Sequence, residues 1–206
     1  MMLSPDRGFL AGNSSTIKLF ACRDEQDFAA RSPASLSPEY QPDGVRSTDK
    51  TQMGLLQEQI DAIRMAGSIH DIGKLSIPAE ILSKPTKLSA LEFSLIKEHS
   101  RSEYEILKGV ESSWPLAEIV YQHHERMDGS GYPRNLKGDD ILMGARILAV
   151  ADVVESMASH RPYRPALAID AVLEEIEKNR GTPYDESVVD ACLRLFREKG
   201  YRLAEA

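Results

Sequence analysis

Residues 138–159, GDDILMGARILAVADVVESMAS, form the most strongly helical stretch of this 206-residue chain. Apolar side chains recur along it at helical spacing, and two acids stand at its start. Its apolar run is interrupted by Arg146, Asp152 and Glu155. The stretch is therefore too polar, and its uninterrupted apolar part too short, to cross a bilayer. The stretch therefore predicts a long helix in a mainly α-helical protein.

Further helices are predicted on both sides of this stretch. Ser89 opens the run SALEFSLIKEHS, and Glu92 follows three residues later, which is the pattern of a helix capping box. Alternating strand patterns are scarce, so the sequence predicts an all-α helical bundle with a short irregular loop at DGSGYP. The other predicted helices are one from Gly54 into HDIGK, a short one opened by Pro78, one from Pro115 into the paired histidines, and two near 167–179 and 185–199.

Composition excludes several classes of function. The net charge is −7 and the basic residues are scattered, which argues against binding of polymeric nucleic acid. Two distant cysteines, Cys22 and Cys192, indicate no disulfide framework, so a cytoplasmic location is expected. The first residues lack a signal-peptide pattern, and no stretch resembles a membrane span.

The chain divides by composition into two parts. Residues 1–53 are rich in Ser, Pro, Asp and Arg, and we expect a poorly ordered or atypical segment there. Residues 54–206 carry the periodic apolar pattern and are expected to form the folded domain.

The histidines gather in one part of the chain, between residues 70 and 160, and most of them stand beside acids. Imidazole and carboxylate groups together suit iron, manganese or zinc. On a helix, adjacent residues such as His123 and His124 project to different sides, so we expect them to serve different ions of one cluster. A site with two ions can clamp the oxygens of a phosphoryl group during its displacement. The alternative is that these histidines are helix caps and satisfied polar groups.

Four motifs together resemble a known family. HDIGK at 70–74, EHS at 98–100, HHERMDGSGYP at 123–133 and ILAVADVVESMASHRPYR at 147–164 are similar to the HD-GYP domain, a subgroup of the HD phosphohydrolase superfamily. The resemblance covers residues 54–206. The ending GTPYDESVVDACLRLFREKGYRL resembles members of this family that carry sensory PAS modules.

The resemblance implies a fold, an activity and a site. It implies an all-α bundle that hydrolyses the second messenger cyclic di-GMP to linear pGpG or GMP, with a divalent metal cluster of two ions, iron or manganese, and with signalling proteins as partners. It implies catalytic roles for Asp71 and Lys74, and substrate contacts from Tyr132, Arg161 and Arg164. The implied metal ligands are His70, Asp71, His99, His123, His124 and Asp152.

Each implied role has a structural alternative. The alternative for Lys74 is a cation that interacts with a helix C-terminus. The alternative for Asp152 is a solvent-exposed acid on a helix. An apolar run surrounds Asp152, however, and a buried carboxylate needs a partner such as a metal. Alternatively, Arg161 and Arg164 are surface residues without a substrate contact, and Tyr132 is an aromatic side chain packed in the protein.

The sequence departs from the family upstream of HDIGK. The resemblance implies an earlier helix with a further histidine ligand, but residues 30–53 hold no histidine and contain Pro33, Pro38 and Pro42. We therefore expect an impaired metal site and an uncovered apolar groove. The rival hypothesis is a non-catalytic module of HD-GYP descent that binds a nucleotide or a protein, and a third is an HD phosphohydrolase for another nucleotide.

Overall fold

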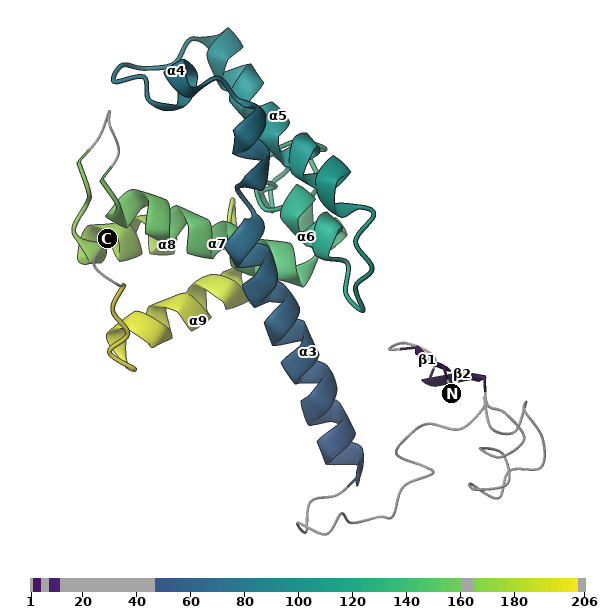
Figure 1. Cartoon of the computed structure of the whole chain (residues 1–206). Coiled ribbons are helices and arrows are strands. Elements are labelled where there is room, and N and C mark those ends of the chain that lie inside the picture. The colour runs from purple at the N-terminus through teal and green to yellow at the C-terminus, as the bar shows by residue number, and fades with distance from the viewer. Residues whose placement is uncertain (1, 5–7, 12–46, 161–164, 204–206) are drawn as a thin grey trace, which may run out of the picture. The chain divides into compact units, whose positions relative to one another are not determined.

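The structure is a computed structural model that describes most of the chain (Figure 1). The residues that it describes fall into two units, one ending at Asp61 and the other beginning at Ala62. The described residues are 2–4, 8–11, 47–160 and 165–203.

The second unit is helical, as the sequence predicts. The first unit contains a short antiparallel hairpin of β1 (Met2–Ser4) and β2 (Gly8–Ala11), which the sequence does not predict, and the start of α3 (Ser47–Ile69). The remaining elements are η2 (Ile72–Ser76), α4 (Ala79–Leu82), α5 (Ala90–Leu107), α6 (Leu116–Tyr121), η3 (Gly138–Asp140), α7 (Met143–Ala158), α8 (Ile169–Lys178) and α9 (Glu186–Arg197).

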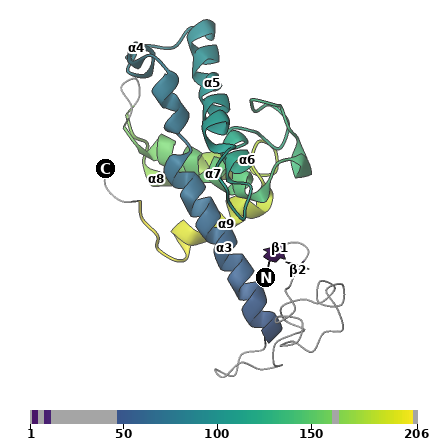
Figure 2. The ribbon, with the colours of Figure 1, turned by 45° about the vertical axis from the view of Figure 1, so that its right-hand side comes forward.

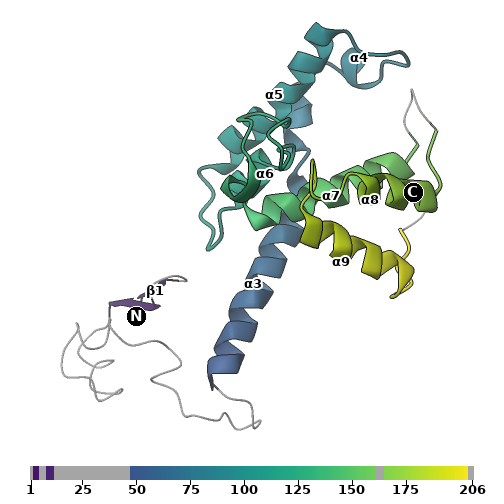
Figure 3. The same ribbon diagram turned by 180° about the vertical axis from the view of Figure 1, so that it is seen from behind.

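Helix α7 lies between α6 and the pair α8 and α9 (Figure 3), and it joins two apolar clusters of the second unit. Val150 and Val154 of α7 pack with the apolar faces of α8 and α9. Leu148, also on α7, packs with α6 and with residues near the ends of α3 and α5. The burial of these branched side chains supplies the main stabilising contribution to the bundle.

Helix α5 lies against α6 (Figure 2), and it also contacts the short helix η2. Its capping box is confirmed, because Glu92 N donates to Ser89 Oγ at 3.3 Å and Ser89 N donates to Glu92 Oε2 at 2.7 Å. Gly73 of η2 is buried against the helix, and a Cβ at this position would overlap the main-chain carbonyl oxygen of His99. The missing side chain of Gly73 therefore permits the close packing of η2 on α5.

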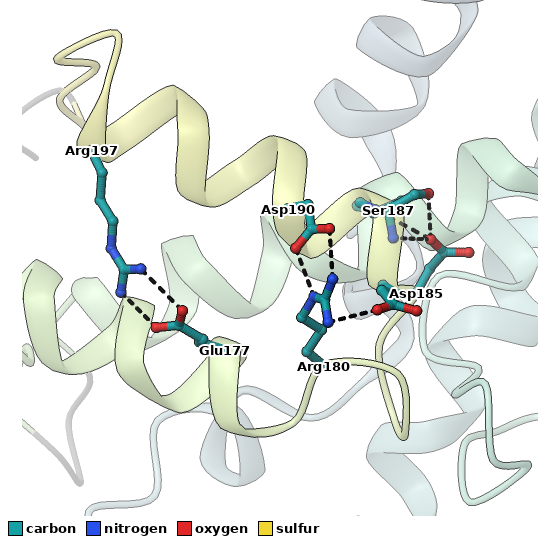
Figure 4. Close-up of polar contacts among 8 residues, drawn as sticks. Glu177, Arg180, Asp185, Ser187, Asp190 and Arg197 are labelled. Carbon is teal, nitrogen blue, oxygen red and sulfur yellow. Dashed lines mark hydrogen bonds and ion pairs between the residues drawn. The ribbon is translucent and has the colours of Figure 1, made fainter.

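Helices α8 and α9 are joined by charged contacts on their surface (Figure 4). Arg197 donates to both carboxylate oxygens of Glu177, at 3.2 and 2.7 Å, and Arg180 does the same to Asp190, at 2.6 and 2.8 Å. Exposed pairs of this kind contribute little to stability, and the apolar faces of α8 and α9 hold the two helices together. Asp185 caps the start of α9 by accepting from Ser187 N at 2.9 Å.

An apolar groove of about 500 Å³ lies between α7 and α9. Ile147, Val154, Leu195 and Phe196 are among the residues that line it. The sequence predicts an uncovered apolar groove where the upstream helix is missing. That prediction rests on residues 30–53, of which 30–46 lie outside the described residues, so it stays a prediction and is not tested by this groove.

Several predicted boundaries are wrong. The first long helix begins at Ser47 rather than Gly54, and the helix predicted from 138 begins at Met143, because Gly138 has a φ of 50° and η3 intervenes. The paired histidines follow α6 instead of ending it. The proposed boundary at 53/54 remains a prediction. Among the described residues, no helix has the length and apolarity that a membrane crossing requires.

The packing at Gly73 makes a prediction about stability. Gly73→Ala should lower the free energy of unfolding by about 3 kcal/mol, because the added Cβ forces η2 away from α5. Gly109→Ala is the matched control, since a Cβ there meets nothing within 4 Å. Urea denaturation followed by circular dichroism measures both variants. Equal stability of the two variants would show that η2 does not depend on this contact.

Candidate metal centre

Four histidines from three segments come together in the second unit. His70 directly follows α3, His99 lies in α5, and His123 and His124 follow α6. Their ring centroids are 3.9 Å apart for His123 and His124, 5.0 Å for His99 and His124, and 5.3 Å for His70 and His123. Two of the rings, those of His99 and His123, are almost completely buried. The sequence places these residues up to 54 positions apart, so the fold itself builds the cluster.

Three of the imidazoles are held in the same way. Nδ1 of His70, His99 and His123 each lies within hydrogen-bond distance of the main-chain carbonyl three residues earlier, at 2.8, 2.5 and 2.5 Å. A carbonyl oxygen only accepts, so Nδ1 of each ring carries a proton, and Nε2 is the nitrogen that can offer a lone pair once it is deprotonated. Metal-binding histidines in proteins are oriented by this kind of bond. The three carbonyls belong to Gly67, Ile96 and Val120.

The free ring nitrogens converge on one another. His123 Nε2 is buried without a hydrogen-bond partner among the described residues, and His124 Nε2 lies 3.1 Å from His99 Nε2. One ligand atom from each of these three histidines lies within 4.8 Å of the others. Ligand atoms of one ion with bonds near 2.1 Å lie about 3 to 4 Å apart, so this group fits a single divalent ion with small adjustments.

The geometry of the paired histidines differs from the helical projection that the sequence predicts, while the ions that they serve remain a prediction. The sequence predicts that His123 and His124 point to different sides and serve different ions. In the structure their rings lie 3.9 Å apart at an angle of 40°, and both share a group with His99. The reason is that they lie in the turn after α6, where the 100° spacing of a helix does not apply.

Three predicted charged residues surround His70. Asp152 Oδ1 of α7 lies 3.6 Å from His70 Nε2, and its side chain is only 17% exposed, which argues against a solvated helix acid. Asp71 Oδ2 lies 3.9 Å from the same nitrogen, and Asp71 Oδ1 pairs with Lys74 Nζ at 2.6 Å. Lys74 is also the basic residue in the last turn of η2. The position of Lys74 therefore agrees both with a catalytic role and with that of a cation at a helix C-terminus.

The loop that carries Tyr132 is fixed beside the histidines. Glu125 is buried and accepts hydrogen bonds from the main-chain N–H groups of Arg134 and Leu136, at 2.7 and 3.0 Å. Tyr132 N donates to the carbonyl of His124 at 3.2 Å, and the two rings lie 4.6 Å apart. Tyr132 is therefore a packed aromatic that also borders the site.

Gly131 allows this loop to lie close to the chain before it. A Cβ on Gly131 would overlap main-chain atoms of residues 124–126. The close approach explains why the residue beside Tyr132 is a glycine.

Two predicted site residues cannot be placed. Arg161 and Arg164 lie outside the described residues. His160, which the family resemblance does not use, is exposed.

Glu103 is a residue of this site that the sequence does not single out. It lies one helical turn after His99 on α5, is fully buried, and belongs to a second group of ligand atoms with Asp71 and His99. The only sequence feature that could have pointed to Glu103 is its spacing of four residues from His99, which places both side chains on one face of a helix.

Burial and charge set the protonation of the site. The Asp152 carboxylate raises the pKa of His70 to about 9, although burial acts in the opposite direction. Burial lowers the pKa of His99, of His124 and of His123, the last to about 4. Near neutral pH the protein without metal therefore holds three neutral imidazoles and one imidazolium.

The donor set fits a divalent metal ion. It combines neutral imidazole nitrogens with carboxylates, which are the ligands of iron, manganese and zinc. A bound ion would also provide a partner for the buried His123 Nε2, which otherwise has none.

The His70–Asp152 pair predicts a pH dependence for the protein without metal. A raised His70 pKa means that the pair stabilises the fold below pH 6.5 and loses this effect as the pH rises through about 9. In chelator-treated protein at pH 6, Asp152→Asn should lower the free energy of unfolding by about 2 kcal/mol. By pH 10 the difference should vanish or change sign. A difference that is constant between pH 6 and pH 10 would contradict the pairing.

Comparison with known proteins identifies the family of the chain. Residues 45–188 match the family model of the HD domain. A region of 145 residues, 69% of the chain, is 45% identical to the cyclic di-GMP phosphodiesterase response regulator RpfG of Xanthomonas campestris pv. campestris. A cyclic di-GMP phosphodiesterase of Thermotoga maritima is 41% identical over 71% of the chain. The 3'3'-cGAMP-specific phosphodiesterase 1 of Vibrio cholerae is 42% identical over 69% of the chain.

The matched regions make up only part of those relatives: 38% of the Xanthomonas protein, 40% of the Thermotoga protein and 33% of the Vibrio protein. The family model, by contrast, covers more than half of this chain and includes every described residue of the histidine cluster. This chain therefore belongs to the HD domain family, and its sequence motifs place it in the HD-GYP group of that family.

Proposed function

We propose that this chain is a metal-dependent phosphodiesterase that hydrolyses cyclic di-GMP to linear pGpG or GMP. The main support for the proposal is the common orientation of the imidazoles of His70, His99 and His123. Each is held through Nδ1, so that Nε2 can bind a metal. The names of the relatives support a cyclic dinucleotide as the substrate.

The proposed centre holds two divalent ions, iron or manganese. One group of ligands is His99, His123 and His124. A second group surrounds His70 and Asp152. Asp71 lies between them, since it is 3.9 Å from His70 Nε2 and also shares a group of ligand atoms with His99. This position suits a carboxylate that faces both ions.

The bound ions would supply Lewis-acid stabilisation of the charge that develops on the phosphodiester. Lys74 adds a positive charge at the same place, and its pairing with Asp71 holds the ammonium beside the site. Asp71 is 42% exposed, so water and substrate can reach it. We propose Asp71 and Lys74 as the catalytic residues in this arrangement.

The substrate would lie against the loop that follows the paired histidines. Tyr132 forms a wall beside His124, and Glu125 keeps that wall in place through its two main-chain hydrogen bonds. Arg161 and Arg164 remain proposed contacts for the phosphates or bases of the substrate. Signalling proteins remain proposed partners, and a cytoplasmic location remains proposed.

A second candidate substrate is 3'3'-cGAMP. The Vibrio relative that is 42% identical to this chain carries that specificity in its name. Both substrates are cyclic dinucleotides with the same phosphodiester chemistry, so they share the proposed centre and differ in one base.

The direct test is turnover by the purified chain after loading with manganese or with ferrous iron. The wild type should linearise cyclic di-GMP, and Asp71→Asn should lower kcat by at least about 100-fold, because it removes a charge from the metal centre. Asp140→Asn is a control, since Asp140 is an exposed acid of η3. Chromatography of the products and circular dichroism of each variant provide the readouts.

The outcomes separate the hypotheses. Turnover of 3'3'-cGAMP alone would change the substrate but keep the reaction. Tight binding of cyclic di-GMP without turnover, in folded protein that contains metal, would favour a non-catalytic module. Activity on mononucleotides alone would favour a different HD phosphohydrolase.

A further inference from the structure

Glu103 is a buried carboxylate inside the proposed centre. It lies on α5, four residues after His99, so both side chains occupy the same face of the helix. Its side chain is fully buried, as is the ring of His99. A carboxylate that faces the interior is costly unless hydrogen bonds or a cation stabilise it.

The protein satisfies only one oxygen of this carboxylate. Gly73 N donates to Glu103 Oε1 at 3.3 Å, whereas Oε2 is buried without a hydrogen-bond partner among the described residues. Lys74 is the nearby cation of η2, but its ammonium pairs with Asp71 at 2.6 Å. Oε2 therefore lacks the partner that a buried carboxylate oxygen requires.

The Glu103 carboxylate lies beside two other metal donors. Asp71, His99 and Glu103 each offer one ligand atom, and these three atoms lie within 4.8 Å of one another. That spacing is close to what a single divalent ion with oxygen and nitrogen ligands needs. The same ion would neutralise the carboxylate and bond to its unpartnered oxygen.

We propose that Glu103 is a further ligand of the metal centre, binding a divalent ion together with Asp71 and His99. This inference rests on the proposed metal-dependent function. It assigns a role to a residue that comes from the helix of His99 rather than from any of the sequence motifs. The competing explanation is that Glu103 carries a proton and serves only as an acceptor for Gly73 N.

The test compares metal binding by Glu103→Gln and by wild type. Glutamine keeps the size of the side chain and the acceptor for Gly73 N, but it lacks the charge. Chelator-treated protein is titrated with Mn²⁺, and bound ions are counted by elemental analysis and by the Mn²⁺ electron paramagnetic resonance signal. Glu103→Gln should bind at least one ion at least about tenfold more weakly than wild type.

The matched control is Glu105→Gln, which changes an exposed glutamate of the same helix and should leave Mn²⁺ binding unchanged. Equal Mn²⁺ affinity and stoichiometry for Glu103→Gln and wild type would overturn the inference. Absence of metal binding by the wild type itself would instead overturn the proposed function, so the two failures are distinct.

A second measurement does not depend on the variant. In crystals of the Mn²⁺-loaded wild type, anomalous density should lie within about 2.5 Å of a Glu103 carboxylate oxygen. Density bound by the histidines alone, with Glu103 more than about 4 Å away, would overturn the inference even if Glu103→Gln failed to fold.

Discussion

The close contact between Gly73 and the main chain of His99 is the constraint on which the site depends. Because Gly73 has no side chain, η2 can lie directly on α5. This contact brings Asp71, at the start of η2, to the face of α5 that carries His99 and Glu103. The apolar clusters around α7 then hold Asp152 near His70. A bulkier residue at position 73 would separate ligands that are far apart in the sequence.

The second physical feature is the contrast between two kinds of histidine. His99, His123 and His124 are kept neutral by burial, and so they keep a lone pair that a metal can take. His70 is paired with Asp152 and is protonated in the protein without metal. A divalent ion would replace that proton between two groups that are already in place. The charge balance of the site therefore suits metal binding, and catalysis by the centre follows as a proposal from it.

Much of the fold could be predicted from the sequence, because helices depend on local patterns. The capping box at Ser89 and Glu92 is one example, and the all-α class of the second unit is another. Glu103 could not be predicted, since its burial is decided by η2 packing onto α5 and not by its neighbours in sequence. The close approach of the His123 and His124 rings could not be predicted for a similar reason, because it depends on where α6 ends.

The number of metal ions bound per chain shows whether the protein holds a two-ion centre. Protein that has been loaded with Mn²⁺ or Fe²⁺ and then freed of unbound metal by gel filtration can be measured by elemental analysis. We expect two ions per folded chain, because the histidine group and the group around His70 and Asp152 are separate sets of donors joined by Asp71. Folded protein that retains one ion per chain or fewer would contradict it.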